Sequence, residues 1–204
     1  MPGRTIKVLA VAVSAAVALA GCGGGPVRTG SAAIVGDHRI TISTLGQAVE
    51  DWEREFRADP RANQLRSMNP PPADTDVQNA LFGLVQIRLT DEAARRAGLR
   101  VSDGQVDMAL NSLNRDPRRG PASSFARARG LPARYARDLA RQAVIVGEVL
   151  RRNGDDGTGF RTLVSQTAQS LGVRINPRYG TFDPDRLVFG PVRTTLSSPG
   201  SGVG

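Results

Sequence analysis

Apolar residues recur at helical spacing along most of the chain, and this pattern predicts a mainly helical protein. Leu45, Val49, Trp52 and Phe56 lie at i, i+4, i+7 and i+11, which places them on one face of a helix ending near residue 57. Ser43 precedes this stripe and is the expected N-cap. Similar patterns, together with capping residues, predict further helices at about residues 75–97, 102–113, 123–129, 132–152 and 160–171.

Short β-like segments stand near both ends of this helical region. Ala33–Val35 is followed by a turn at Gly36-Asp37 and a second extended piece at Ile40–Ile42, and Val173–Ile175 follows the last predicted helix. We expect Ile34-Val35 to pair antiparallel with Val173–Ile175. The expected fold is therefore all-α, mainly helical, with a minor two-stranded β element that joins the N- and C-terminal ends of the domain.

Prolines interrupt the helical pattern between the first two predicted helices. Pro60 and the triplet Pro70-Pro71-Pro72 lie in this stretch, and proline in a helix interior removes a hydrogen bond and clashes with the preceding turn. Residues 58–74 are therefore expected to form a long loop that runs extended over the surface.

The N-terminus has the pattern of an export signal. Arg4 and Lys7 precede an apolar run from Val8 to Leu19. A helix of this length covers roughly 18 Å, which is too short for a hydrocarbon core of about 30 Å. We expect residues 1–21 to be a cleaved signal peptide.

The run closes with Leu19-Ala20-Gly21-Cys22, which resembles the lipobox of bacterial lipoproteins. The resemblance implies cleavage between Gly21 and Cys22 and attachment of palmitate-type acyl chains to Cys22. Two or three chains make a stable anchor, whereas one binds only marginally. The protein is then expected on the extracytoplasmic face of the cell membrane. The alternative interpretation is a free thiol in a flexible glycine-rich stretch.

The pattern divides the chain into four parts. After the signal peptide, residues 22–31 are a lipidated flexible tether rich in glycine, and residues 32–190 form the helical domain. Residues 191–204 contain Ser, Gly, Thr and Pro with little to bury, so disorder is expected.

The net charge of +8 does not by itself indicate a nucleic-acid partner. Lys7 is the only lysine, so the excess is arginine and is explained more simply by a GC-rich genome. Contact with anionic lipid or a cell-wall polymer stays open. Arg134, Arg137 and Arg141 share one helix face, and we interpret them as solvated surface, with an anionic contact as the alternative.

The sequence offers few residues for catalysis or metal binding. His38 is the only histidine and stands in a predicted turn, and Cys22 is assigned to lipid. Residues 154–159 lack the lysine of a phosphate loop and the ligand spacing of a calcium loop, so an interhelical turn is expected. The carboxylates on the first helix, among them Asp51 and Glu55, are interpreted as a solvated face. We expect no enzyme activity, no cofactor and no metal.

The two ends of the domain resemble the SurA N-terminal domain family. Residues 33–41 are similar to its opening strand and turn, and Val173–Asp183 is similar to the closing segment of actinobacterial members. The resemblance implies an extracytoplasmic chaperone. Related proteins often carry a parvulin prolyl isomerase domain before the closing strand, but about twenty residues separate Leu150 from Val173, too few for a domain of roughly 50 residues or more.

The expected function is therefore binding of unfolded or nascent exported polypeptides without prolyl isomerase activity. The alternative is an envelope scaffold that holds one specific secreted or cell-wall partner. The candidate peptide-binding residues are Trp52, Phe56, Phe82, Leu84 and Leu113, because an apolar side chain left between helices can accept an extended segment.

Overall fold

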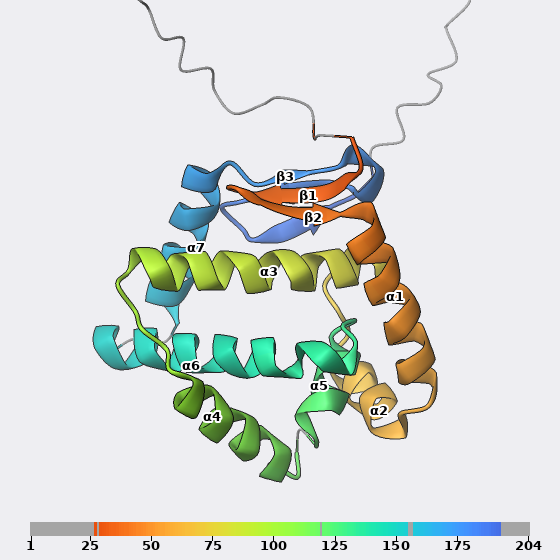
Figure 1. Cartoon of the computed structure of the whole chain (residues 1–204), viewed down its shortest axis with the longest axis vertical. Coiled ribbons are helices and arrows are strands. Elements are labelled where there is room, and N and C mark those ends of the chain that lie inside the picture. The colour runs from red at the N-terminus through yellow and green to blue at the C-terminus, as the bar shows by residue number, and fades with distance from the viewer. Residues whose placement is uncertain (1–26, 28, 119, 155–156, 193–204) are drawn as a thin grey trace, which may run out of the picture.

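Helices are stacked below a small sheet at one end of the molecule (Figure 1). The computed structural model describes residues 27, 29–118, 120–154 and 157–192. The expected signal peptide, the lipidation site at Cys22 and the tail after residue 192 lie outside the described residues. None of the described helices is long and apolar enough to cross a membrane.

The strand β1 (Ser31–Val35) lies at the centre of a three-stranded sheet. It pairs antiparallel with β2 (His38–Thr41) on one side and with β3 (Arg174–Ile175) on the other. Ala33 lies opposite Ile175 and Ile34 opposite Arg174, which confirms the predicted pairing of the two ends of the domain. All five residues of β1 are buried, so this short strand is part of the core. Its pairing with β3 also joins the two ends of the domain.

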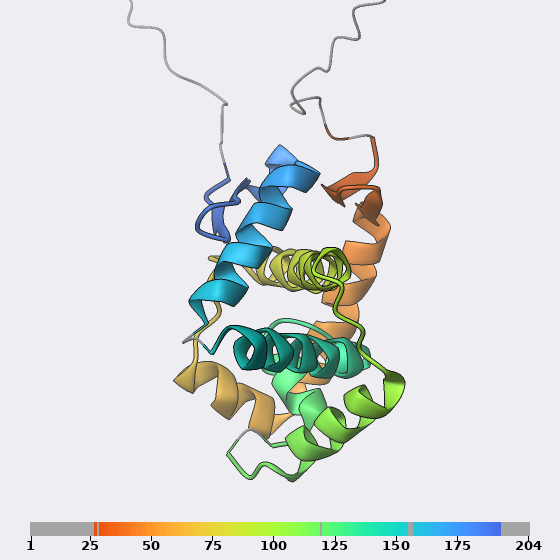
Figure 2. The same cartoon turned by 90° about the vertical axis from the view of Figure 1, so that its left-hand side faces the viewer.

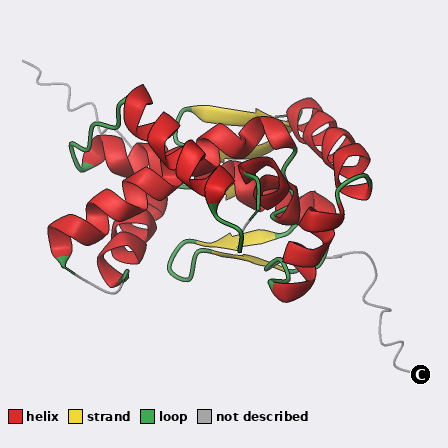
Figure 3. Ribbon diagram, turned by 90° about the horizontal axis from the view of Figure 1, so that it is seen from below, coloured by secondary structure: helices red, strands yellow, loops and turns green. Residues whose placement is uncertain are grey.

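A separate hairpin follows β3 and was not predicted from the sequence. It consists of β4 (Thr181–Asp183) and β5 (Val188–Gly190), after the 3₁₀ turn η2 (Pro177–Tyr179). Each strand has three residues, too few for an alternating pattern to stand out. Figure 3, which views the molecule from below, shows the hairpin and the three-stranded sheet as two separate groups of strands.

The first helix, α1 (Ile42–Arg57), follows β2 directly. Its N-cap is Thr41, whose Oγ1 accepts from the backbone N–H of Thr44 at 3.0 Å. The prediction of Ser43 as N-cap was wrong, because the extended backbone at the end of β2 already places the threonine hydroxyl over the first turn. The predicted end at Arg57 is confirmed.

The predicted long loop at residues 58–74 was wrong in its first half, which forms the helix α2 (Pro60–Met68). Asp59 caps this helix, with Oδ1 accepting from the N–H of Ala62 at 3.0 Å. Pro60 occupies the first helical turn, where a missing N–H costs nothing. The proline triplet lies outside the helix, as expected.

The helix α3 (Asp76–Arg96) runs through the middle of the molecule. Thr75 caps it, and Gly98 follows its end in the left-handed conformation that favours glycine, with φ of 63°. Leu81, Val85 and Leu89 are completely buried. Figure 2 looks nearly along α3 and shows α1 on one side of it and α7 on the other.

The remaining helices lie close to the predicted positions. They are α4 (Asp103–Arg115), α5 (Ala122–Ala128), α6 (Ala136–Asn153) after the 3₁₀ turn η1 (Ala133–Tyr135), and α7 (Thr158–Leu171). A capping box of Ser102 and Gln105 begins α4. The protein is therefore mainly α-helical with minor antiparallel β elements, as the sequence predicts.

The Glu92 carboxylate near the end of α3 makes the stability of the fold depend on pH. Its carboxylate accepts from Arg95 Nε at 2.7 Å and from Arg96 Nε at 2.8 Å. These hydrogen bonds lower the pKa of Glu92 from its ordinary value of 4.5 to about 2. A carboxyl whose pKa is depressed in the folded state stabilises the fold above its unfolded pKa and loses that contribution as pH falls toward the folded value.

We predict that Glu92→Gln lowers the free energy of unfolding near pH 6, and that the difference from wild type shrinks as pH falls from about 4.5 to about 2. Chemical denaturation at a series of pH values measures this difference. Glu50→Gln, the same change at an exposed position on α1, is the control. A difference for Glu92→Gln that stays constant over this pH range would contradict the prediction.

Candidate functional site

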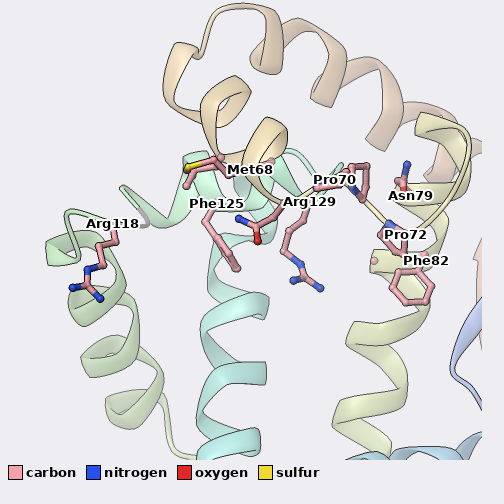
Figure 4. A pocket seen from close by; sticks show the side chains of 13 residues that line it. Met68, Pro70, Pro72, Asn79, Phe82, Arg118, Phe125 and Arg129 are labelled. Carbon is pink, nitrogen blue, oxygen red and sulfur yellow. The ribbon is translucent and has the colours of Figure 1, made fainter.

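A groove of about 620 Å³ lies where α2, α3 and α5 meet (Figure 4). This volume is within the range of about 300–1,000 Å³ typical of ligand sites in proteins. Apolar groups dominate its lining, and its charged residues are arginines. The lining residues are Leu65, Met68, Asn69, Pro70, Pro71, Pro72, Asn79, Phe82, Gly83, Arg118, Phe125, Ala128 and Arg129.

One wall is the proline triplet, and Asn79 of α3 fixes the segment that follows it. The side-chain Oδ1 of Asn79 accepts from the N–H of Ala73 at 3.0 Å, and Nδ2 donates to the carbonyls of Ala73 at 3.0 Å and Thr75 at 2.9 Å. Asn79 is buried, so its polar atoms need these partners. The wall is therefore tied to the first turns of α3.

The close approach of α3 to the connection between α5 and η1 forms the back of the groove. A Cβ atom added at Gly83 would lie 2.9 Å from Leu131 Cδ1, and one added at Gly130 would lie 3.1 Å from Asn79 Cβ. Gly130 also has φ of 82°, which disfavours other residues. Glycine at both positions allows the two segments to pack closely behind the lining residues.

Phe82, Phe125 and Met68 supply apolar surface from three different helices. The ring of Phe82 packs edge to face against Phe189 of the hairpin, with the ring centroids 5.5 Å apart. Met68 is 55% exposed, which is unusual for a large apolar side chain. The guanidinium of Arg129 lies over the Phe125 ring, 5.6 Å from its centroid. In Figure 4 this guanidinium points into the space between Phe125 and Phe82.

A polar network beside the groove joins α5 to α1 and α2. Arg127 Nη1 donates to Asp59 at 2.6 Å and its Nε donates to Glu55 at 3.1 Å. Ser124 Oγ also donates to Asp59 at 2.7 Å, and the N–H of Ala133 donates to Glu55 at 2.7 Å. These bonds fix the helix that carries Phe125.

Burial opposes the ionisation of Asp59, but hydrogen bonds outweigh it. The donors are the Ala62 N–H, the Ser124 hydroxyl and the Arg127 guanidinium, and the pKa of Asp59 is lowered. Asp59 therefore caps α2 and pairs with α5 as a carboxylate.

The acidic face of α1 was expected to be solvated, and for two of its members this was wrong. Glu55 belongs to the network above, and Asp51 pairs with Arg134. The arginine face of α6 is paired in the same way: Arg137 contacts Asp103 and Asp107, and Arg141 Nε lies 2.8 Å from Asp91. The arginines for which contact with an external anion was the alternative interpretation are therefore paired with carboxylates of the chain itself.

Of the five residues predicted to bind peptide, only Phe82 lines the groove. Trp52 is 3% exposed and stacks on Phe56, with ring centroids 5.0 Å apart, while its Nε1 donates to the carbonyl of Arg127 at 2.7 Å. Leu84 is buried in the core, and Leu113 is half-buried on α4 outside the groove. The role of all five in peptide binding stays a prediction.

The sequence reasoning missed Met68, Phe125, Arg129 and the proline triplet as groove residues. Their convergence depends on α2, which was expected to be loop, and on the packing of α5 against it. A methionine two residues before three prolines was the one available signal, because such a pair of features places apolar side chains on an irregular surface segment. His38 lies elsewhere, beside Arg88 and Arg95.

The described residues contain no group of three or more side chains placed to hold a metal ion. Residues 3–120 match the family model described as the SurA-like N-terminal domain. The chain belongs to this family. The family is a chaperone-type module, so the domain is chaperone-like. No curated protein and no solved structure matches the chain.

The family match covers one side of the groove and ends before the other. It includes α2, the proline triplet and the whole of α3, whereas Phe125 and Arg129 lie beyond residue 120. Both sides pack into one structure, because α5 contacts α1 and α2.

We predict that Arg127→Met lowers the free energy of unfolding by about 1–3 kcal/mol, because it leaves two partly buried carboxylates without their cation. Urea denaturation at neutral pH measures the effect. Arg151→Met is the matched control, since Arg151 pairs with Glu148 on the solvent-exposed surface, where water screens the ion pair and its effect on stability is small. Equal destabilisation by the two variants would show that the network does not hold α5 in place.

Proposed function

We propose that this protein is a membrane-anchored extracytoplasmic chaperone that binds non-native or extended polypeptides without prolyl isomerase activity. The groove carries the proposal, because its apolar lining comes from three helices and its walls are fixed by Asn79 and by the Arg127 network. A fixed apolar groove lowers the entropy cost of ordering a bound chain. Membership of the SurA-like N-terminal domain family supports a polypeptide as the ligand.

The groove offers binding without acid–base chemistry. Among the described residues that line it there is no Asp, Glu, His or Cys, and its polar side chains are Asn69, Asn79 and the two arginines. General acid–base catalysis needs a group that exchanges protons near the working pH. The lining therefore supports capture and release of a polypeptide rather than turnover.

A membrane anchor at Cys22 is consistent with the position of the groove. β1 begins at Ser31, the last residue of the predicted tether, and lies at the opposite end of the molecule from α2, α4 and α5 (Figure 1). An anchor ahead of β1 would attach the protein to the membrane at the end of the molecule opposite the groove. Exported polypeptides would then reach it from the extracytoplasmic space.

We expect residues 23–204, which contain every described element, to slow the aggregation of a denatured model protein at micromolar concentration. Light scattering measures this, and proline isomerisation in a test peptide should keep its uncatalysed time of tens to hundreds of seconds. Met68→Gln should need a several-fold higher concentration for the same delay. Met108→Gln is the matched control, because Met108 is 66% exposed but lies on α4 outside the groove.

Failure to protect any of several unrelated clients, with one stoichiometric partner in pull-downs, would favour the envelope scaffold instead. Clear isomerase activity would contradict the mechanism.

We further predict that Cys22→Ala blocks lipid attachment and signal-peptide processing, because the lipobox thiol is the acceptor of the diacylglyceryl group. Radiolabelled palmitate and gel mobility follow the two events. The variant should accumulate as an unlabelled precursor. Lipid-labelled protein of mature size from this variant would refute the anchor.

A further inference from the structure

The charged side chains of the groove are of one sign. Arg118 and Arg129 line it, and no carboxylate is among its described lining residues. Many other arginines of the described chain are paired with Asp or Glu, among them Arg127 and Arg134. The groove thus combines apolar surface with two arginines, and no carboxylate is among its described lining residues.

Arg129 is held in the groove without a polar partner for its side chain among the described residues. Its guanidinium lies over the Phe125 ring, 5.6 Å from the ring centroid, and a contact with a ring face leaves its N–H donors available. Its side chain is exposed to solvent, yet the surrounding protein desolvates it enough to lower its pKa. An exposed cation inside a concave apolar wall meets the conditions for a strong charge-assisted hydrogen bond.

Arg118 stands at a fixed position at the same groove. Arg61 of α2 donates from Nη2 to the carbonyl of Pro117 at 2.8 Å and to that of Arg118 at 2.5 Å. Gly120 closes the same turn with φ of 68° and passes directly over the Arg61 side chain. The backbone that carries Arg118 is therefore tied to α2, and the second cation is part of the folded structure.

We infer that the groove selects extended polypeptide segments in which an acidic side chain is flanked by apolar residues. Arg129 binds the carboxylate, Arg118 adds attraction at the same groove, and Phe82, Phe125 and Met68 contact the flanking side chains. This inference rests on the proposed polypeptide binding and adds the chemistry of the preferred segment. The inference assigns a ligand to Arg129, whereas arginines such as Arg127 and Arg134 already pair with carboxylates of the chain.

The geometry favours an aspartate or glutamate side chain over a neutral one for a physical reason. A carboxylate accepts two N–H bonds from one guanidinium, whereas an amide of the same shape offers a single weaker acceptor. The Arg129 guanidinium already lies over the Phe125 ring, 5.6 Å from its centroid, and this contact restrains the side chain, so less entropy is lost when the pair forms. Flanking apolar residues remove water from the pair and strengthen it further.

The test compares three N-acetylated fluorescent peptides by anisotropy with residues 23–204. The first places one glutamate between leucines and ends in an amide, the second replaces that glutamate with glutamine, and the third is the glutamine peptide with a free C-terminal carboxylate. We expect the glutamate peptide to bind about tenfold more tightly than the other two, which is the effect of roughly one charge-assisted hydrogen bond. Its affinity should also fall as salt is raised.

Arg129→Gln should reduce the affinity of the glutamate peptide to that of the glutamine peptide and leave the latter unchanged. Arg129→Lys should restore part of the difference, because charge returns without the planar pair of donors. Arg178→Gln is the control for net charge, since Arg178 is exposed on η2 away from the groove. Thermal melting of each variant verifies that the fold is intact.

Equal affinity for all three peptides, or loss of the difference in Arg178→Gln as well, would overturn the inference and leave the proposed chaperone function standing. Preference for the free C-terminus would also overturn it, because the ligand would then be a chain end. If no peptide binds, the acidic preference falls, and the aggregation assay decides separately whether the protein protects clients.

Discussion

The burial of α3 is the constraint on which the rest of the structure depends. This helix packs against β1, α1, α6 and α7 at once, so each neighbour is positioned by the same set of side chains. Its first half also builds the groove: Asn79 holds the segment after the prolines, Gly83 admits Leu131, and Phe82 lies between the groove and the hairpin. The candidate binding surface is thus attached to a helix whose side chains are largely buried in the core.

Residues beyond the family match contribute to both the three-stranded sheet and the groove. β1 belongs to the match, but its second neighbour, β3, follows more than a hundred residues later in the chain, and Phe125 and Arg129 come from the same later part. The arginine excess follows this organisation. Arginines of α5, η1 and α6 pair with carboxylates of α1, α3, α4 and the N-cap of α2, and these ion pairs tie the elements together. Arg129 has no such pair among the described residues and is available at the groove.

Long helices with a regular apolar stripe could be predicted closely, as α3 illustrates, which spans Asp76–Arg96 where a helix at about residues 75–97 was predicted. So could the pairing of β1 with β3, because β-like segments stood at both ends of the helical region. The helix α2 was missed since Pro60 suggested loop, although proline is well tolerated in a first turn. The groove was beyond sequence reasoning, because stripes do not distinguish buried Trp52 and Leu84 from a side chain such as Phe82 that is left at a junction of helices.

The most direct test of the central claim, that the groove binds non-native polypeptide, is site-specific photo-crosslinking. A photoreactive side chain replaces Met68 at the groove or Met108 on α4, two exposed methionines that differ in their location. The protein is irradiated with a denatured client during dilution from urea. We predict crosslinks to the client from position 68 and few from position 108. Equal yields at both positions, or crosslinks only from position 108, would contradict the account.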